Sequence, residues 1–240
     1  MRADNRKPDE LRPVVINTDF SSYAEGSVLI SIGNTKVLCN VSIDENIPRW
    51  IEIEGRSGGW ITAEYAMLPR STHKRRPREI YRLGGRTQEI RRLIGRSLRA
   101  AVDLNTIGKR TFIIDCDVLQ ADGGTRTAAI TGGYLALYIA LKELEKKHIL
   151  TINPFKNQIA AISVGIVRGV PMLDLSYEED LIADVDSNIV MNNRSEFIEI
   201  QSTAEKESFS YELMEQLLQL AKKGINELIQ IQKTIQREFS

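Results

Sequence analysis

Several residue types are scarce in this chain of 240 residues, which has two cysteines, two histidines and 6% aromatic residues. Two cysteines cannot make a disulfide framework, and no Cys/His spacing typical of a zinc site occurs. Cys39 and Cys116 each lie in an apolar, β-branched run, as buried structural thiols do. The few aromatic residues near the basic segments, Tyr65 and Tyr81, indicate that base stacking is not a dominant feature.

Long hydrophobic runs and a net charge are also missing. No run of 18 apolar residues occurs, so we expect no membrane span. The first seven residues have no apolar core, so we expect no signal peptide. Together with the unpaired thiols, this favours a cytoplasmic protein. The 32 basic and 32 acidic residues cancel, so overall charge does not indicate a nucleic-acid binder.

The charge is nevertheless distributed unevenly. Residues 70–99 hold ten arginines and one lysine against two glutamates, whereas residues 171–240 hold 14 acidic and 6 basic residues. The first segment is typical of a surface that contacts a polyanion, and the second of carboxylate chemistry or a partner surface. With 42% apolar residues, the chain has the composition of an ordinary globular protein.

Hydrophobic periodicity predicts strands, a helix, a strand, a helix, strands and a final helix, which is an α+β arrangement of the α/β type. We expect hairpins around Gly33-Asn34 and Gly169, a loop at 47–60, and a basic loop or a frayed helix at 70–85. We expect helices at 87–102, 125–146 and from 210 onward, and strands at 111–119 and within 189–201. No low-complexity linker interrupts the chain. We therefore predict a single domain over 1–240, with a core unit at about 10–150 and a second sheet with the last helix at about 151–240.

The segment Gly123-Gly124-Thr125-Arg126-Thr127 lies between a predicted strand and a predicted helix. Two glycines let the backbone approach a ligand closely, and the free N–H groups of a helix start attract an anion. Thr125 adds a hydroxyl, and Arg126 adds a planar fork that matches two phosphate oxygens. The alternative is a Gly-rich turn that simply begins a helix. Because no Lys-Ser or Lys-Thr follows, the segment is not a nucleoside-triphosphate P-loop.

Arginines dominate the segment before this turn. Arg86 follows Gly84-Gly85, precedes Thr87, a candidate helix cap, and is predicted to face the same anion as Arg126. Arg92, Arg96 and Arg99 share one helix face, which is an RNA-binding surface, an ordinary solvated face or a subunit contact. Four loop arginines serve either RNA binding or subunit assembly, and the sequence does not decide between these roles: Arg70, Arg75, Arg76 and Arg78.

Six carboxylates crowd into residues 174–186. Glu178 and Glu179 are interpreted as part of a solvated loop. Asp180 and Asp186 lie close to the apolar run that begins at Ile189, so they are placed near the rim of a sheet. Two such carboxylates can hold Mg²⁺ beside a transferring phosphoryl group.

In combination, these stretches resemble the bacterial ribonuclease PH family over nearly the whole chain. The resemblance rests on segments that occur in the family's order: residues 10–13, 26–29, 33–37, 62–70, 85–87, 91–96, 115–127, 177–180 and 185–188. One departure is Asp4-Asn5-Arg6, where the family commonly has glycine before the arginine. Another is the less polar Arg82-Leu83-Gly84-Gly85, which adjoins the expected phosphate site.

The resemblance implies a fold of tandem βαβα units, of the type also found in polynucleotide phosphorylase. It implies a phosphorolytic 3′-exoribonuclease that trims transfer-RNA precursors and possibly ribosomal RNA, releasing nucleoside diphosphates in a reversible nucleotidyl transfer. Arg86, Gly124, Thr125 and Arg126 would bind inorganic phosphate, and Asp180 and Asp186 would serve catalysis and Mg²⁺. The resemblance also implies a homo-hexamer, a trimer of dimers.

Two alternative functions are also compatible with some of these sequence features. A non-catalytic, RNA-binding ring subunit of an exosome-like assembly typically lacks the anion-binding arginine or the acidic pair, and this chain has both. A hydrolytic nuclease that uses the acidic cluster would leave the phosphate-binding residues without a role. Phosphate is itself an anionic nucleophile, so the phosphorolytic reaction needs no histidine base.

Overall fold

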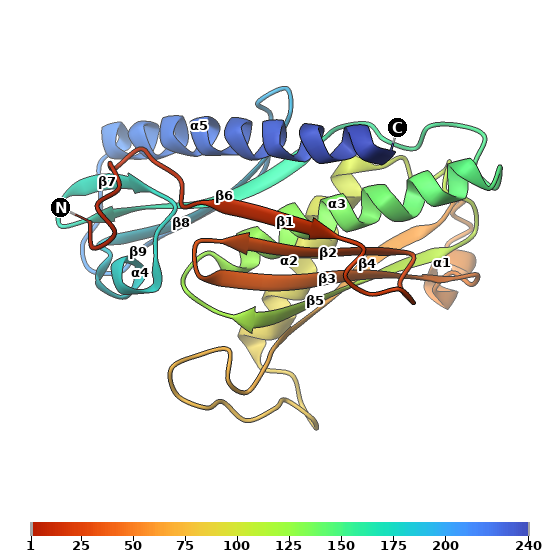
Figure 1. The fold of residues 1–240 in the computed structure, drawn as a ribbon, viewed down its shortest axis with the longest axis horizontal. Helices are drawn as coiled ribbons and strands as arrows, with labels where there is room; N and C mark the ends of the chain where they lie inside the picture. Colours follow the sequence, from red (N-terminus) through yellow and green to blue (C-terminus); the bar gives the residue numbers. More distant parts are fainter. Residues whose placement is uncertain (1, 240) are drawn as a thin grey trace.

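The computed structural model describes residues 2–239, which form two β-sheets with helices packed between and against them (Figure 1). The strands are β1 (Val14–Thr18), β2 (Gly26–Ile32), β3 (Thr35–Asp44), β4 (Trp60–Met67), β5 (Thr111–Gln120), β6 (Ile159–Val167), β7 (Val170–Leu173), β8 (Val185–Asn192) and β9 (Phe197–Ala204). The helices are α1 (Arg49–Ile53), α2 (Gly85–Ala101), α3 (Thr125–Lys146), α4 (Tyr177–Ile182) and α5 (Tyr211–Gln236). A short 3₁₀ helix, η1 (Arg237–Phe239), follows.

The first sheet has the strand order β1-β2-β3-β5-β4. Its strands pair antiparallel except β4 and β5, which run parallel and are joined through α2 as a βαβ unit. The parallel pairing puts the carboxyl ends of β4 and β5 at the same edge of the sheet. The loop into α2 and the turn into α3 both leave from that edge, so it brings the predicted phosphate-binding residues together.

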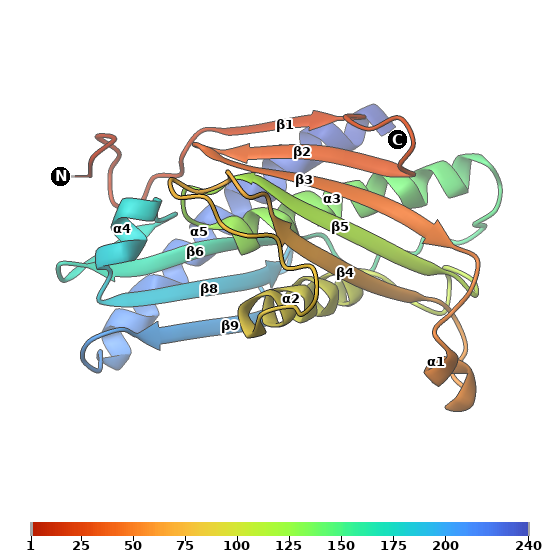
Figure 2. The same cartoon turned by 90° about the horizontal axis from the view of Figure 1, so that it is seen from below.

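The second sheet has the order β7-β6-β8-β9 and is entirely antiparallel (Figure 2). The amphipathic helix α5 packs on β6, β7 and β8. Ser210 begins this helix as predicted, because its hydroxyl accepts a hydrogen bond from the Leu213 amide.

Helix α3 lies between the two sheets, in contact with β2 and β3 of the first and with β6 of the second. Most of its residues are buried all round the helix, including Ala128, Leu135 and Ala140. Because α3 touches both sheets, one hydrophobic cluster extends through both halves of the chain. The α+β class is thus confirmed.

The structure differs from the predicted elements at five places. The predicted loop at 47–60 contains α1, and β1, β4 and α4 were not foreseen. Thr87 does not cap α2, which begins two residues earlier after Gly84. Residues 68–84 form a loop, the first of the two predicted alternatives, and Figure 1 shows it projecting from the body of the molecule.

Asn5 adopts φ 61° at the position where the resemblance expects glycine. Asparagine is among the residues that tolerate the left-handed region best, so this departure preserves the local backbone. Both cysteines are buried and unpaired, as expected. No helix within residues 2–239 has the length and apolarity needed to cross a membrane.

Candidate active site

The phosphate-binding turn, defined here as Asp122–Thr125, joins β5 to α3. Gly123 and Gly124 both adopt left-handed conformations, with φ 77° and 64°, which other residues rarely reach. Gly124 is the residue preceding the first turn of α3, so the first free N–H groups of a 22-residue helix lie beside Thr125 and Arg126. The predicted anion site is therefore a true helix start.

Tyr65 from β4 links this turn to α2. Its hydroxyl group lies 2.9 Å from the Thr125 Oγ1 atom. Burial raises the pKa of Tyr65, whereas the hydrogen bond with Thr125 and the charges of Arg86 and Arg126 act in the opposite direction. Both arginines therefore lie within electrostatic reach of one hydroxyl pair, although 39 residues separate them. The structure brings together the four residues predicted to bind phosphate.

Asp180 and Asp186 face the same place from the second half of the chain. Burial raises the pKa of Asp180, and the charges of Arg86 and Arg126 oppose that shift. The pKa of Asp186 rises to about 6, first because of burial and then because of repulsion from Asp180. Glu205 adds a smaller repulsion to both groups. The two carboxylates are thus close neighbours that lie opposite two arginines.

Arg126 connects the two halves at this site. Its Nη1 atom donates a hydrogen bond to Gln201 Oε1 on β9 at 3.3 Å and lies 3.9 Å from Glu89 Oε1 on α2. Gln201 Nε2 in turn donates to Glu89 at 3.2 Å. These contacts hold a guanidinium group with 16% side-chain exposure at the junction of α2, α3 and β9, where its other edges remain available to an anion.

The acidic pair fits Mg²⁺. Within residues 2–239, no cluster of three or more His, Cys, Asp or Glu side chains is arranged to hold a metal alone. Mg²⁺, however, is commonly bound by one or two carboxylates together with water and substrate phosphate oxygens. Burial raises the pKa values of both groups, and repulsion from Asp180 adds to the shift of Asp186; a divalent cation would offset both effects.

The three helix arginines predicted to bind RNA have different surroundings. Arg99 stacks over the Trp60 ring at 4.4 Å and donates to the Ile61 carbonyl at 2.8 Å, so it fastens α2 to β4. Arg96 is exposed and pairs with Glu199 at 2.8 Å, and Arg92 is exposed. RNA binding by all three stays a prediction, and Arg99 has the least freedom to take part.

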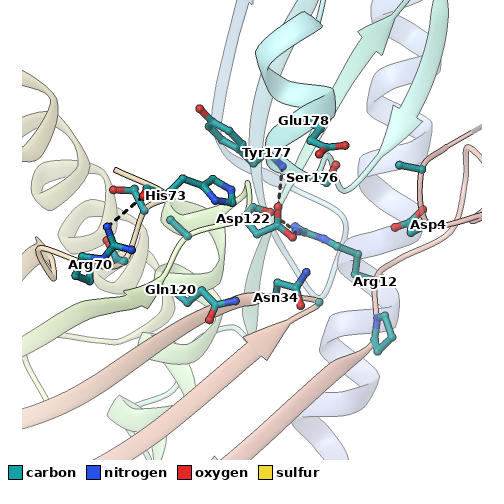
Figure 3. Close-up of a pocket in the computed structure, with 16 residues that line it drawn as sticks. Asp4, Arg12, Asn34, Arg70, His73, Gln120, Asp122, Ser176, Tyr177 and Glu178 are labelled. Atoms are coloured by element: carbon teal, nitrogen blue, oxygen red, sulfur yellow. Dashed lines mark hydrogen bonds and ion pairs between the residues drawn. The ribbon is translucent and has the colours of Figure 1, made fainter. Parts of the chain in front are cut away.

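A cavity of about 800 Å³ lies behind the phosphate-binding turn (Figure 3). Its lining includes Arg12, Asp122, His73 and Tyr177, whereas Arg86, Thr125 and Arg126 are not part of it. A smaller cavity of about 310 Å³ adjoins the phosphate site, with Tyr65 and Arg86 in its wall together with the loop residues Arg76 and Arg78. We place the reaction beside the smaller cavity, because Arg86 and Tyr65 line it, whereas none of the four residues predicted to bind phosphate lines the larger one.

Tyr65, Gln201 and Glu89 were missed by the sequence analysis as site residues. The motif containing Tyr65 was part of the family resemblance, but no charge or spacing distinguished the tyrosine itself. Gln201 contacts Arg126 across 75 residues and Glu89 across 112 residues, and no local pattern reveals such contacts.

Replacing Tyr65 by phenylalanine is expected to raise the KM for phosphate about fivefold with little change in kcat, because one hydrogen bond that orients Thr125 is lost. The measurement is the initial rate of RNA shortening against phosphate concentration. Tyr134→Phe is the matched control, since this tyrosine is equally buried and its hydroxyl contacts Gln236 at 3.3 Å, away from the site. An unchanged KM in Tyr65→Phe would contradict the orienting role.

Comparison with known proteins finds relatives over nearly the whole chain. Two family models match, described as 3′ exoribonuclease family, domain 1 (residues 10–143) and domain 2 (residues 157–224). A curated relative, ribonuclease PH of Solibacter usitatus (strain Ellin6076), is 53% identical over 237 residues, covering 98% of this chain and 99% of the relative.

Solved structures share the fold at lower identity. Rice (Oryza sativa) Rrp46 matches with a TM-score of 0.78 at 20% identity, covering 98% of this chain and 99% of its own. The Archaeoglobus fulgidus exosome with RNA bound to the active site matches with a TM-score of 0.76 at 22% identity, covering 100% and 92%. The archaeal exosome core matches with the same TM-score and identity, covering 97% and 91%.

Fold and site together define a phosphorolytic 3′-exoribonuclease. At this identity over nearly the full length of both chains, the chain belongs to the ribonuclease PH family. The two family models leave residues 144–156 between them, and the single domain with a core unit at about 10–150 stays a prediction.

Proposed function

We propose that this enzyme trims the 3′ ends of transfer-RNA precursors, and of other accessible RNA 3′ ends, with inorganic phosphate as the nucleophile. One observation carries the proposal: the charges of Arg86 and Arg126 act both on Tyr65 of the Tyr65–Thr125 hydroxyl pair and on Asp180 of the acidic pair. Positive and negative groups are thus segregated across one site, as a reaction between two phosphate groups requires.

The arginines and the turn would hold the nucleophile. Arg86 and Arg126 offer planar donors, Thr125 a hydroxyl, and the start of α3 its free N–H groups. An oxygen of the bound phosphate attacks the phosphorus of the last phosphodiester, and a new P–O–P link forms. The bond from that phosphorus to the 3′ oxygen of the preceding nucleotide breaks, and a nucleoside diphosphate leaves.

The acidic pair acts at the departing oxygen. Asp180 and Asp186 are the residues that would bind Mg²⁺, which offsets the negative charge that builds up around the attacked phosphorus. The 3′ oxygen takes up a proton as it departs. Asp186, with its pKa raised to about 6, holds a proton more readily than an ordinary carboxyl group. Either a cation or a proton relieves the repulsion within the pair, so its geometry suits both roles.

We also propose that the chain works in the cytoplasm as a homo-hexamer, a trimer of dimers. The kinship in fold with exosome-core subunits supports a ring assembly. The projecting loop at 68–84 supports it too, because its arginines extend from the body of the molecule, where RNA or a second subunit can reach them (Figure 1).

Shortening of an RNA with a free 3′ end is expected to require inorganic phosphate and to release nucleoside diphosphates. The measurement is product analysis by chromatography, with Mg²⁺ present and with phosphate, sulfate or neither. Sulfate has the shape of phosphate but forms no diphosphate product, so it should act only as an inhibitor. Adding nucleoside diphosphates should lengthen the RNA.

The rival functions give different outcomes in the same assay. A hydrolytic nuclease would release nucleoside monophosphates whether or not phosphate is present. A non-catalytic ring subunit would bind the RNA and leave its length unchanged. Either result would overturn the proposal.

A further inference from the structure

The phosphate-binding turn needs support from outside itself. Two consecutive glycines in left-handed conformations have many alternatives in a free chain, and ordering them is entropically costly. The orientation of the N–H groups at the start of α3 depends on these two residues. Whatever holds the peptide groups of Asp122 and Gly123 therefore also determines how well phosphate is bound.

Thr35 is the first such support. It is the first residue of β3 and is fully buried, with 0% exposure. Its hydroxyl donates a hydrogen bond to the Gly123 carbonyl at 2.6 Å and accepts one from the Asp122 amide at 2.9 Å. The Thr35 hydroxyl group thus hydrogen-bonds both the Asp122 amide and the Gly123 carbonyl of the turn.

Arg12 is the second support, and it is 4% exposed. Its Nη1 atom donates to the Asp122 carbonyl (Figure 3). Its Nη2 atom donates to the Gly123 carbonyl at 3.4 Å. On the other side, its Nε and Nη2 atoms donate to the two carboxylate oxygens of Asp174 at 2.9 and 2.6 Å. Gly33 makes room for it, because a Cβ there would come within 2.6 Å of the Arg12 Cδ atom.

The same contacts place the turn against the acidic segment. A Cβ on Gly123 would collide with the Leu175 carbonyl, so the turn lies directly on the chain that leads into α4. The Tyr177 amide, at the start of α4, donates to Asp122 Oδ1 at 3.2 Å. Asp180 is on this helix. Arg12 therefore hydrogen-bonds the phosphate-binding turn and also Asp174, which lies in the segment that leads to Asp180.

We propose that Thr35 and Arg12 are positioning residues that hold the Asp122 and Gly123 peptide groups and thereby pre-form the phosphate site. Neither side chain touches the nucleophile. Their loss leaves every phosphate-binding side chain in place but lets the turn sample other conformations, so phosphate binds more weakly. This inference rests on the proposed function, because it concerns the affinity for inorganic phosphate as a substrate.

The test compares Thr35→Val with Thr35→Ser. Valine keeps the shape of threonine and removes both hydrogen bonds, whereas serine keeps the hydroxyl. Valine is expected to raise the KM for phosphate about tenfold, with kcat at saturating phosphate and the KM for RNA close to those of the unmodified enzyme. Serine is expected to restore a KM close to normal. The measurement is the rate of RNA shortening against phosphate concentration, alongside a thermal melt.

Thr131→Val is the matched control for lost stability. Thr131 is also fully buried, and its hydroxyl donates to the Ala161 carbonyl at 3.2 Å and accepts from the Ala161 amide at 3.1 Å. It lies in the same helix as Thr125, away from the turn. This variant should lower the melting temperature about as much as Thr35→Val does and leave the KM for phosphate unchanged.

Arg12→Lys is the second, independent test. Lysine keeps a positive charge for buried Asp174 but cannot reach both carbonyl groups, so the KM for phosphate is expected to rise here as well. A normal KM in both Thr35→Val and Arg12→Lys would overturn the inference, as would an equal rise in Thr131→Val. A different result would overturn the proposed function itself: a rate of RNA shortening by the unmodified enzyme that does not depend on phosphate concentration.

Discussion

Replacing Arg126 by alanine is expected to reduce the rate of phosphorolysis by a factor on the order of 10³ while the protein stays folded. Arg126 provides one of the two guanidinium groups around the Tyr65–Thr125 pair, and its charge also opposes the raised pKa values of Asp180 and Asp186. Without it, phosphate must bind close to two carboxylates with only Arg86 to offset their charge. Both the affinity for phosphate and the stabilisation of the transition state are therefore lost.

The fold should survive this change, because the contacts of Arg126 with Gln201 and Glu89 are few and long, at 3.3 and 3.9 Å. The measurements are kcat/KM for phosphate and a thermal melt. Arg126→Lys should recover only part of the rate, since lysine keeps the charge but lacks the planar fork. Arg194→Ala removes an exposed arginine that is paired with Glu196 in a surface turn, and it should change neither quantity appreciably. A rate close to normal in Arg126→Ala would show that phosphate binds elsewhere.

The phosphate-binding residues were predictable because their signals are local. A Gly-Gly pair between a β-branched run and a helical pattern marks a strand, a turn and a helix start, and the structure has β5, the turn and α3 at these positions. Gly33-Asn34 likewise marks the hairpin between β2 and β3, where Gly33 has φ 55°. In each case the turn has a backbone conformation with positive φ, which glycine adopts readily and most other residues do not.

Strand β4 was missed because its inward side chains give a weak pattern. Ile61, Ala63 and Tyr65 alternate toward the core, but alanine contributes little hydrophobic contrast and Glu64 lowers the β-propensity. The strand is held mainly by pairing with β5, about 50 residues further along. Helix α4 left a clearer signal, since Ser176 and Glu179 form a capping box that the sequence spells out.

The supports of the turn could not be predicted. Thr35 and Arg12 contact the turn across 88 and 110 residues, and neither stands out in its own segment. Asp174 was counted with the acidic cluster, yet it is buried against Arg12 and serves the structure, as does Glu179, which binds Arg2 at 2.7 Å. The sequence did set Asp180 and Asp186 apart from Glu178 and Glu179, but its assignment of Glu179 to a solvated loop is wrong, because Glu179 is buried and paired with Arg2.

Replacing Asp186 by asparagine is expected to stabilise the metal-free protein at neutral pH and to eliminate most of its activity. The native pKa of about 6 exceeds the ordinary value of 3.8, so the folded protein binds this proton more tightly than the unfolded chain does. The free energy of unfolding contributed by Asp186 therefore falls as the pH rises from about 4 to about 6. Asparagine has no charge to bury, and the variant should gain on the order of 1–3 kcal/mol above that range.

Chemical denaturation at pH 4 and pH 7.5 with a chelator present measures this difference, which should be small at pH 4 and largest at pH 7.5. Asp184→Asn is the control of opposite sign. The hydrogen bond from Lys206 lowers the pKa of Asp184, so its stabilising contribution is present at neutral pH, is lost as the pH falls below the ordinary value, and disappears in the variant. Added Mg²⁺ should raise the melting temperature of the unmodified protein more than that of Asp186→Asn, because only the former keeps both carboxylates. A destabilised Asp186→Asn at pH 7.5 would contradict the repulsion within the acidic pair, and an equal response to Mg²⁺ would remove Asp186 from the metal site.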